Sequence, residues 1–264
     1  IFRFFFVLSY YFRKSCFAML DQGQRALEIT SELGVEYCES RIQRRKTTRI
    51  VLNHGRYKQA TYGIERGLGI RVLYKNAWGF SSSTRIDSRA AIETSRRATE
   101  LSRSLSPYVK EDVILSEEPS IKKDIRRKTV NPPSEIGIGE KMDLTQDLYR
   151  EVIGFNPSVA NAEIRYEDFE IDEVLATSEG TELISCRLGL SVGIDAVAKS
   201  GEKMVSCSER TGGIGGFEIA DRGNLLALAR SAAARSIELL DGKPAPSGRS
   251  VSYTHLRAHE TVLD

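Results

Sequence analysis

Long stretches of this sequence alternate between hydrophobic and polar residues, which is the pattern of half-buried β-strands. Over residues 68–74, Leu68, Ile70, Val72 and Tyr74 would share one face of a strand. A longer run places leucine, valine, isoleucine or alanine at every second position from 188 to 198. The pattern therefore predicts two strand-rich regions, one over residues 37–83 and one from residue 159 onward.

Short turn signals separate the predicted strands. Residues 53–55 (Asn-His-Gly) would form a hairpin turn between TTRIVL and RYKQATYG, and residues 75–77 would lead into WGFSSS. In the second region, a strand pair that includes residues 162–177 would turn at residues 178–180. A further turn is expected at residues 199–201, before EKMVSCSE.

Four stretches have the three- and four-residue spacing of amphipathic helices. They cover residues 20–33, 88–105 and 139–153, and a last helix begins near Asp221. Asp87 would cap the start of the second helix, and Gly34 the end of the first. The expected buried stripes are Ala26, Ile29 and Leu33; Ala91, Ser95, Ala98, Ser102 and Leu105; Leu144, Leu148 and Val152; and Leu225, Ala229, Ala233, Ile237 and Leu240.

The same order of elements occurs twice, in residues 19–105 and 139–250: strand, hairpin, long alternating strand, hairpin, strand and helix. We interpret this order as an α+β fold made of duplicated, mostly antiparallel sheet units with helices packed on one face. Residues 106–135, between the halves, hold four of the seven prolines and several charge clusters. They predict a surface connector with room for a short helical piece.

Both ends of the chain differ from the middle. Residues 1–18 contain no methionine, and their apolar run is as long as the core of a signal peptide and too short to span a bilayer. A secretory signal is one interpretation, but no Ala-x-Ala cleavage site is present. We favour mistaken upstream translation before Met19, which makes the cytoplasm the default location. Residues 251–261, VSYTHLRAHET, resemble a translated transposase-type sequencing adapter, so we expect 251–264 to be an artefact.

The composition is that of an ordinary globular protein, with 41% hydrophobic and 28% charged residues. This excludes a collagen-like repeat and a polytopic membrane protein. Residues 1–18 and 251–264 together carry the whole net charge of +2, so residues 19–250 are neutral. That neutrality argues against a nucleic-acid partner. Four cysteines without C-x-x-C spacing argue against a disulfide framework or a thiolate zinc cage.

Histidine spacing offers one candidate for metal chemistry. His255 and His259 are four residues apart, as two zinc ligands on a helix would be. However, Leu256 stands where the water-activating glutamate of H-E-x-x-H belongs, and His54 lies in a distant hairpin turn. We therefore expect neither a metal site nor a catalytic residue in this chain.

Residues 41–49, RIQRRKTTR, carry five positive side chains. No aromatic residue is interleaved with them to stack on bases. We favour a solvated edge strand that is protected by its charge over a nucleic-acid surface.

A glycine-rich segment lies just before the last predicted helix. It consists of Thr211, Gly212, Gly213, Ile214, Gly215, Gly216 and Phe217. The segment matches neither G-x-G-x-x-G nor the Walker pattern, because Glu218 occupies the last glycine position and no Lys-Ser/Thr follows. The simpler interpretation is a connector whose turn needs positive backbone angles.

Several segments together resemble the TldD/PmbA family of metalloproteases, once called modulators of DNA gyrase. The resemblance covers about residues 20–249, and AWGFSSST and KPAPSG favour the TldD side of the family. The segments are GVEYCESRIQRRKTTRIVLNHGR, GLGIRVLYKNAWGFSSST, SEGT, ERTGGIGGFE and LLDGKPAPSG.

The resemblance implies that residues 19–250 are the amino-terminal domain of a cytoplasmic zinc metallopeptidase, a hydrolase that cleaves unfolded or flexible peptides. In this family a carboxy-terminal domain carries zinc on a helix with H-E-x-x-x-H and a later cysteine. The spacing of His255 and His259 does not match that motif, so no catalytic or metal-binding residue carries over, and this fragment would be inactive alone. The alternative is a non-catalytic PmbA-type partner or binding module.

The resemblance also bears on partners. Such proteins work as dimers, with themselves or with a PmbA-type partner, and enclose a chamber for extended peptides. An extended peptide is commonly held by strand addition, and a segment without side chains allows close approach. The second interpretation of Thr211–Phe217 is therefore a substrate entrance beside the catalytic domain.

Overall fold

Two units with the same order of elements follow one another along the chain. The computed structural model describes residues 2–126, 129, 131–243, 247 and 248, with side chains from Cys16 onward. The first unit consists of α1 (Phe2–Glu32), β1 (Tyr37–Asn53), β2 (Arg56–Tyr74), β3 (Ala77–Ser83) and α2 (Ser88–Leu105). The second consists of α3 (Ile138–Gly154), β5 (Val159–Thr177), β6 (Glu182–Ser200), β7 (Lys203–Ile214) and α4 (Arg222–Glu238). This repeated order confirms the α+β prediction.

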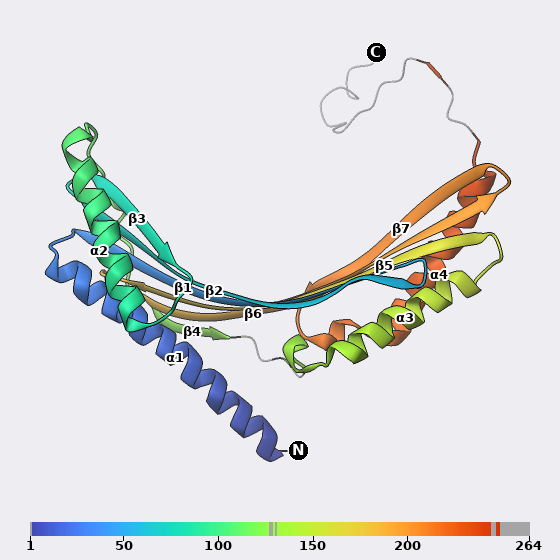
Figure 1. Cartoon of the computed structure of the whole chain (residues 1–264), viewed down its shortest axis with the longest axis horizontal. Helices are drawn as coiled ribbons and strands as arrows, with labels where there is room; N and C mark the ends of the chain where they lie inside the picture. Colours follow the sequence, from blue (N-terminus) through green and yellow to red (C-terminus); the bar gives the residue numbers. More distant parts are fainter. Residues whose placement is uncertain (1, 127–128, 130, 244–246, 249–264) are drawn as a thin grey trace, which may run out of the picture.

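Pairing between β1 and β5 joins the two units into one sheet. The two strands are antiparallel, with Glu39 opposite Thr177 and Asn53 opposite Glu163. The strand order is β3-β2-β1-β5-β6, and β7 continues the antiparallel sheet beyond one part of β6. In Figure 1 the sheet forms an arch, with the helices on its convex side.

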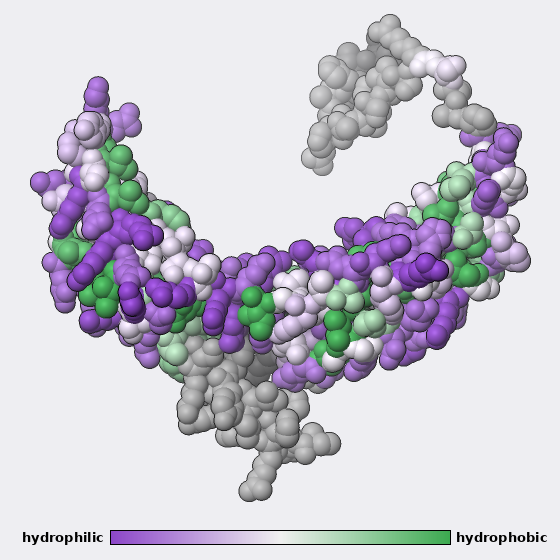
Figure 2. Space-filling model, in the orientation of Figure 1, coloured by the Kyte–Doolittle hydropathy of each residue, from purple (hydrophilic) through white to green (hydrophobic). Residues whose placement is uncertain are grey.

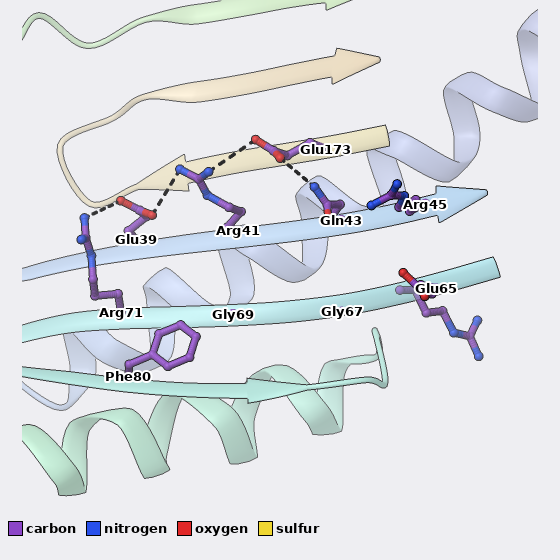
Figure 3. Close-up of a pocket in the computed structure, with 11 residues that line it drawn as sticks. Glu39, Arg41, Gln43, Arg45, Glu65, Gly67, Gly69, Arg71, Phe80 and Glu173 are labelled. Carbon is purple, nitrogen blue, oxygen red and sulfur yellow. Dashed lines mark hydrogen bonds and ion pairs between the residues drawn. The ribbon is translucent and has the colours of Figure 1, made fainter. Parts of the chain in front are cut away.

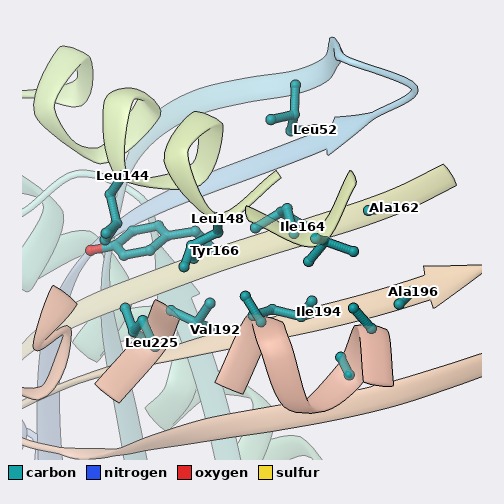
Figure 4. Packing of buried hydrophobic residues seen from close by; sticks show 14 of the residues in the cluster. Leu52, Leu144, Leu148, Ala162, Ile164, Tyr166, Val192, Ile194, Ala196 and Leu225 are labelled. Atoms are coloured by element: carbon teal, nitrogen blue, oxygen red, sulfur yellow. The ribbon is translucent and has the colours of Figure 1, made fainter. Parts of the chain in front are cut away.

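Strand β1 explains why the helices share one face. Ile42 packs in a hydrophobic cluster with residues of α1 and α2, whereas Ile50 packs in a second cluster with residues of α3 and α4. These isoleucines are eight residues apart, and side chains an even number of residues apart lie on the same face of a strand. Figure 4 shows the second cluster, in which Leu148, Ile164 and Ile194 are fully buried. The expected coverage of one face is confirmed.

The hairpin turns lie where the sequence predicts them. Residues with backbone angles in the left-handed region are His54, Gly55, Lys75, Asn76, Gly180 and Gly201. Gly34 has a φ of 70° directly after α1, so the expected helix cap is also confirmed. None of the described helices combines the length and the apolar run needed to cross a membrane.

Helix boundaries differ from prediction at three places. Helix α1 begins at Phe2 rather than near Leu20, because no glycine or proline interrupts the residues before it. Leu105 is half exposed, since the last turn of α2 extends past the edge of the sheet (Figure 1). Leu240 falls in a 3₁₀ turn (Leu239–Asp241) after α4. Whether residues 1–18 belong to the natural gene product stays a prediction.

The connector contains a strand that the sequence analysis missed. Strand β4 (Lys122–Arg126) pairs in parallel with Glu182–Cys186 of β6. Two 3₁₀ turns, Ser106–Tyr108 and Pro133–Glu135, lie on either side of β4 along the chain. Five residues, four of them charged, carry no clear alternation, which is why the pattern gave no strand signal.

Candidate functional site

The glycine-rich segment forms the end of an outer strand. Thr211–Ile214 are the last residues of β7, Gly215 and Gly216 make the turn, and Phe217 begins a 3₁₀ turn (Phe217–Ile219). Among the described strands, β7 pairs with β6 alone, so its other edge is free. The segment is therefore accessible from one side, although four of its seven residues belong to a strand rather than to a loop.

Close packing explains part of the glycine content. No glycine from Gly212 to Gly216 lies in the left-handed region, so the interpretation that the turn needs positive backbone angles is wrong. A Cβ on Gly212 would lie 2.6 Å from the Leu190 carbonyl oxygen, and one on Gly216 would lie 2.4 Å from that of Asn131. A Cβ on Gly213 would make an ordinary contact of 3.6 Å with Ile219. Gly212 and Gly216 are thus required by neighbouring backbone, and Gly213 is not.

Glu218 fixes the turn at the end of this segment. Its carboxylate accepts hydrogen bonds from the Gly216 N–H at 2.9 Å and the Thr129 hydroxyl at 3.0 Å. Burial alone would raise the pKa of Glu218, but these hydrogen bonds hold it below its ordinary value. The Phe217 N–H also donates to the Asn131 carbonyl at 2.7 Å. The turn is therefore tied to the connector.

The predicted cationic edge strand is instead the central strand β1, so that prediction is wrong. Residues 41–49 lie between β2 and β5, and β5 places the acidic run EDFEIDE opposite them. Arg49, for example, lies 3.1 Å from Glu167. The acidic run was visible in the sequence, and it would have indicated the pairing of β1 with β5.

Cations and acids also meet on the helix-covered face, between the two hydrophobic clusters. We call Arg44, Lys46, Asp168, Glu170 and Asp172 the charged strip. The nearest distances are 2.6 Å between Arg44 and Asp172 and 2.7 Å between Lys46 and Glu170. The sequence analysis did not identify this strip, although its acids alternate along β5 as the hydrophobic residues do elsewhere.

Lys141 of α3 completes the charged strip from the helix side. Its Nζ lies 2.5 Å from Asp168 and 3.0 Å from the Thr48 hydroxyl, and the Tyr166 hydroxyl donates to Asp168 at 2.7 Å. Burial, together with the Asp168 charge, raises the pKa of Tyr166, which therefore stays protonated. Burial also raises the pKa of Asp172 in spite of Arg44. Paired, buried groups of this kind hold a structure and offer no free acid, base or nucleophile.

A groove of about 580 Å³ lies on the concave face, opposite the helices. Gly67 and Gly69 of β2 form its floor, Phe80 of β3 forms one wall, and Arg41 and Arg45 of β1 form the other (Figure 3). Figure 2 shows hydrophilic side chains along this upper, concave side of the arch. A smaller hollow of about 190 Å³ continues along β2 toward Gln59 and Thr61.

Arg41, Arg71, Glu39 and Glu173 pair with one another along the groove. Glu39 lies 2.9 Å from Arg71 and 3.6 Å from Arg41, and Glu173 lies 3.7 Å from Arg41 (Figure 3). Gln43 donates to Glu173 at 3.1 Å. This chain of contacts fixes the groove wall, so the groove is suited to binding a ligand rather than to chemistry.

The described residues do not fit a zinc ion. They contain no group of three His, Cys, Asp or Glu side chains that could hold a metal. Zinc binds the thiolate form of cysteine, yet burial raises the pKa of Cys38 to about 11 and also raises that of Cys186. His54 lies alone in the hairpin turn between β1 and β2, and His255 and His259 lie outside the described residues.

Comparison with known proteins identifies both units. Residues 38–102 match the family described as PmbA/TldA metallopeptidase domain 1, and residues 131–240 match the PmbA/TldA metallopeptidase central domain. A metalloprotease of Methanocaldococcus jannaschii is 27% identical over 87% of this chain and 49% of its own length. A zinc metalloprotease TldD homolog of Saccharolobus solfataricus is 26% identical over 67% of this chain and 37% of its own length.

A solved structure shows the same fold. The crystal structure of a candidate modulator of a DNA gyrase from Thermotoga maritima aligns with a TM-score of 0.69 at 17% identity. The alignment covers 86% of this chain and 50% of that protein. The chain spans about half the length of the curated relative from M. jannaschii. This chain belongs to the PmbA/TldD family of metallopeptidases and contains the first and central domains of that family.

Proposed function

We propose that this chain is the substrate-enclosing and dimerisation half of a TldD-like zinc metallopeptidase that cleaves unfolded or flexible peptides. The observation that carries the proposal is the match of both units to metallopeptidase domains, in a chain that spans half of a metalloprotease relative. The arch supports the enclosing role, since its concave face is broad and lined with fixed polar groups.

Zinc enters this proposal through the relatives alone. One relative is named a zinc metalloprotease, and in such enzymes the metal polarises the scissile carbonyl and lowers the pKa of its bound water. Because the described residues do not fit zinc, we assign the metal and the catalytic groups to a further domain of the intact protein. The role of this chain is then to bind and orient the peptide.

The remaining parts of the proposal concern the cellular location, the partners and the substrate entrance. We propose a cytoplasmic enzyme that pairs with a second copy or with a PmbA-type partner and binds no nucleic acid. Pairing of Arg71 with Glu39 and of Arg41 with Glu173 supports the last point, since these two groove arginines are not free for phosphates. Residues Thr211–Phe217 remain the proposed entrance for the substrate, because the outer edge of β7 is open among the described strands.

The test compares this chain with the full gene product. Both are purified, their zinc content is measured, and each is incubated with casein as an unfolded substrate and with a tightly folded protein as control. The full product should hold one zinc per catalytic domain and cleave casein alone, whereas this chain should do neither. One tightly held zinc in this chain, lost when His255 and His259 become alanine, would overturn the assignment of the metal to another domain.

Two further measurements separate the remaining alternatives. The presence of H-E-x-x-x-H downstream of Gly248 in the intact gene supports the enzyme, and its absence supports a non-catalytic PmbA-type partner. Replacing Gly213 by alanine in the full product tests the entrance, because this residue has room for a methyl group. Lost casein cleavage with an unchanged melting temperature supports an entrance, and unchanged cleavage contradicts it.

A further inference from the structure

The backbone edge of β2 is free over most of its length. Strand β2 pairs with β1 from Arg56 to Tyr74, but β3 covers it from Leu68 to Tyr74 alone. Residues 56–67 therefore have one edge that pairs with no described strand. All residues from Lys58 to Arg66 are exposed, so nothing in the described chain shields this edge. An unpaired edge of this length is a template for another strand.

The two faces of this edge differ in a way that suits an added strand. Tyr62 and Ile64, which lie opposite Thr48 and Lys46 on the helix-covered face, are 52% and 56% exposed. On the concave face, Gly63 has no atom within 4 Å of an ideal Cβ, and the nearest atom at Gly67 is 3.6 Å away. An added strand would thus find apolar contacts on one face and open space on the other.

The edge also carries unpaired positive charge. Residues 56–67 contain three cations, Arg56, Lys58 and Arg66, and one carboxylate, Glu65. None of these three cations has a carboxylate within ion-pair distance among the described residues, whereas Arg41 and Arg71 on the neighbouring groove wall do. A second copy would bring the same cations to the same edge, and like charges repel. An acidic strand fits better than a second copy.

We propose that residues 56–67 of β2 bind an extended acidic polypeptide by strand addition, in line with β3. Main-chain hydrogen bonds to the free edge would supply sequence-tolerant affinity. Apolar side chains at alternate positions of the ligand would contact Tyr62 and Ile64, and its Asp and Glu residues would neutralise Arg56, Lys58 and Arg66. That the ligand is the peptidase substrate rests on the proposed function, and strand addition itself does not.

A direct binding experiment tests the proposal. The probe is a fluorescein-labelled decapeptide of alternating valine and glutamate, titrated with this chain at low salt and followed by fluorescence anisotropy. A decapeptide of alternating valine and lysine is its control. We expect the acidic peptide to bind at least about tenfold more tightly, and equal binding of the two peptides would overturn the proposal.

Variants then locate the binding site. Reversing the charge in the triple variant R56E/K58E/R66E should weaken binding of the acidic peptide about tenfold. The matched control R96E/R97E reverses two exposed cations on α2, far along the chain from this edge, and should leave binding unchanged. When the peptide is bound, hydrogen exchange should show new protection of those amides within residues 57–67 that face the free edge. Protection elsewhere, or an equal loss in the control, contradicts the proposal.

Two proline variants distinguish a loss of peptide binding from a loss of folding. Successive amides of a strand point to opposite sides, so Thr61→Pro and Tyr62→Pro remove one N–H toward β1 and one toward the free edge. One variant should therefore be destabilised, and the other should melt normally but lose peptide binding. If the variant that melts normally binds the peptide fully, strand addition is wrong.

Further outcomes distinguish a second copy of this chain from a peptide at the β2 edge. They also separate this inference from the proposed function. A dimer seen by light scattering that the triple variant R56E/K58E/R66E abolishes and that the acidic peptide does not dissociate would assign the edge to a second copy and overturn the proposal. Cleavage is not measured in any of these assays. Binding without cleavage by the full gene product would therefore contradict the proposed function alone, and cleavage without binding at β2 would contradict this inference alone.

Discussion

Lys141 and Asp168 form an ion pair on the helix-covered face of the sheet, with 2.5 Å between Nζ and Oδ2 and with both side chains buried. The pair links α3 to β5 between the two hydrophobic clusters. Desolvating two charges is unfavourable, so the pair stabilises the fold only while both partners are present.

Breaking this pair from one side should destabilise the chain strongly. Lys141→Met leaves the Asp168 carboxylate buried without a cation, and we expect a loss of about 3–5 kcal/mol in the free energy of unfolding by urea. The double variant with Asp168→Asn keeps an acceptor for the Tyr166 hydroxyl and removes the charge. It should recover more than half of that loss. A double variant no more stable than Lys141→Met contradicts a dominant role for the unpaired charge.

Gly79 holds α2 against β3. A Cβ at this position would lie 2.0 Å from the Ala98 carbonyl oxygen and 2.8 Å from Ser102. Gly79→Ala should therefore push α2 away and lower the free energy of unfolding by about 3 kcal/mol. Gly67→Ala is the matched control, because its nearest atom is 3.6 Å away. Equal thermal denaturation curves for the two variants would show that α2 accommodates the methyl group.

Alanine substitutions at the glycines near the end of β7 should differ in their effect on stability, according to how closely each glycine is packed. Gly212→Ala brings a methyl group to 2.6 Å from the Leu190 carbonyl, so it should open the β6–β7 pairing at about 1–3 kcal/mol. Gly213→Ala meets a single side-chain atom at 3.6 Å and should change stability by less than about 0.5 kcal/mol. Urea denaturation measures both, and a larger effect at Gly213 would contradict the packing argument.

The thiol of Cys38 should make stability fall at alkaline pH. Burial raises its pKa from the ordinary 9 to about 11 in the folded chain, so above pH 9 the unfolded state loses this proton first. The stabilisation is complete below pH 9 and is lost as the pH rises to about 11, by about 2–3 kcal/mol. Cys38→Ala removes this contribution, so the two stability curves should converge across that range. Parallel curves would contradict a raised pKa.

Local sequence signals predicted the elements well. Hairpin turns at His54–Gly55 and Lys75–Asn76 combine a polar loop with strands of matching alternation, and both were found. The Asp87 cap was also found, with its carboxylate accepting from the Ala90 N–H. Such features depend on a few neighbouring residues, which is why a sequence is sufficient to locate them.

Long-range pairing could not be read from the same signals. The junction of β1 with β5 joins residues such as Arg44 and Asp172, which are 128 apart in the chain. Alternation assigns a strand two faces but does not name its neighbours, so the cationic run was placed at an edge. The charged strip was missed for the same reason, because a buried charge is recognised by its partner and not by its own position.

The shared sheet has a consequence for synthesis on the ribosome. Ile42 and Ile50 belong to different clusters on one strand, and β1 finds its second neighbour only when β5 has emerged. The first unit ends at Leu105, so one long edge of β1 stays unpaired while more than fifty further residues are made before β5 begins. Nascent chains halted before residue 159 should be held by chaperones or degraded. The two family domains therefore fold as one cooperative unit.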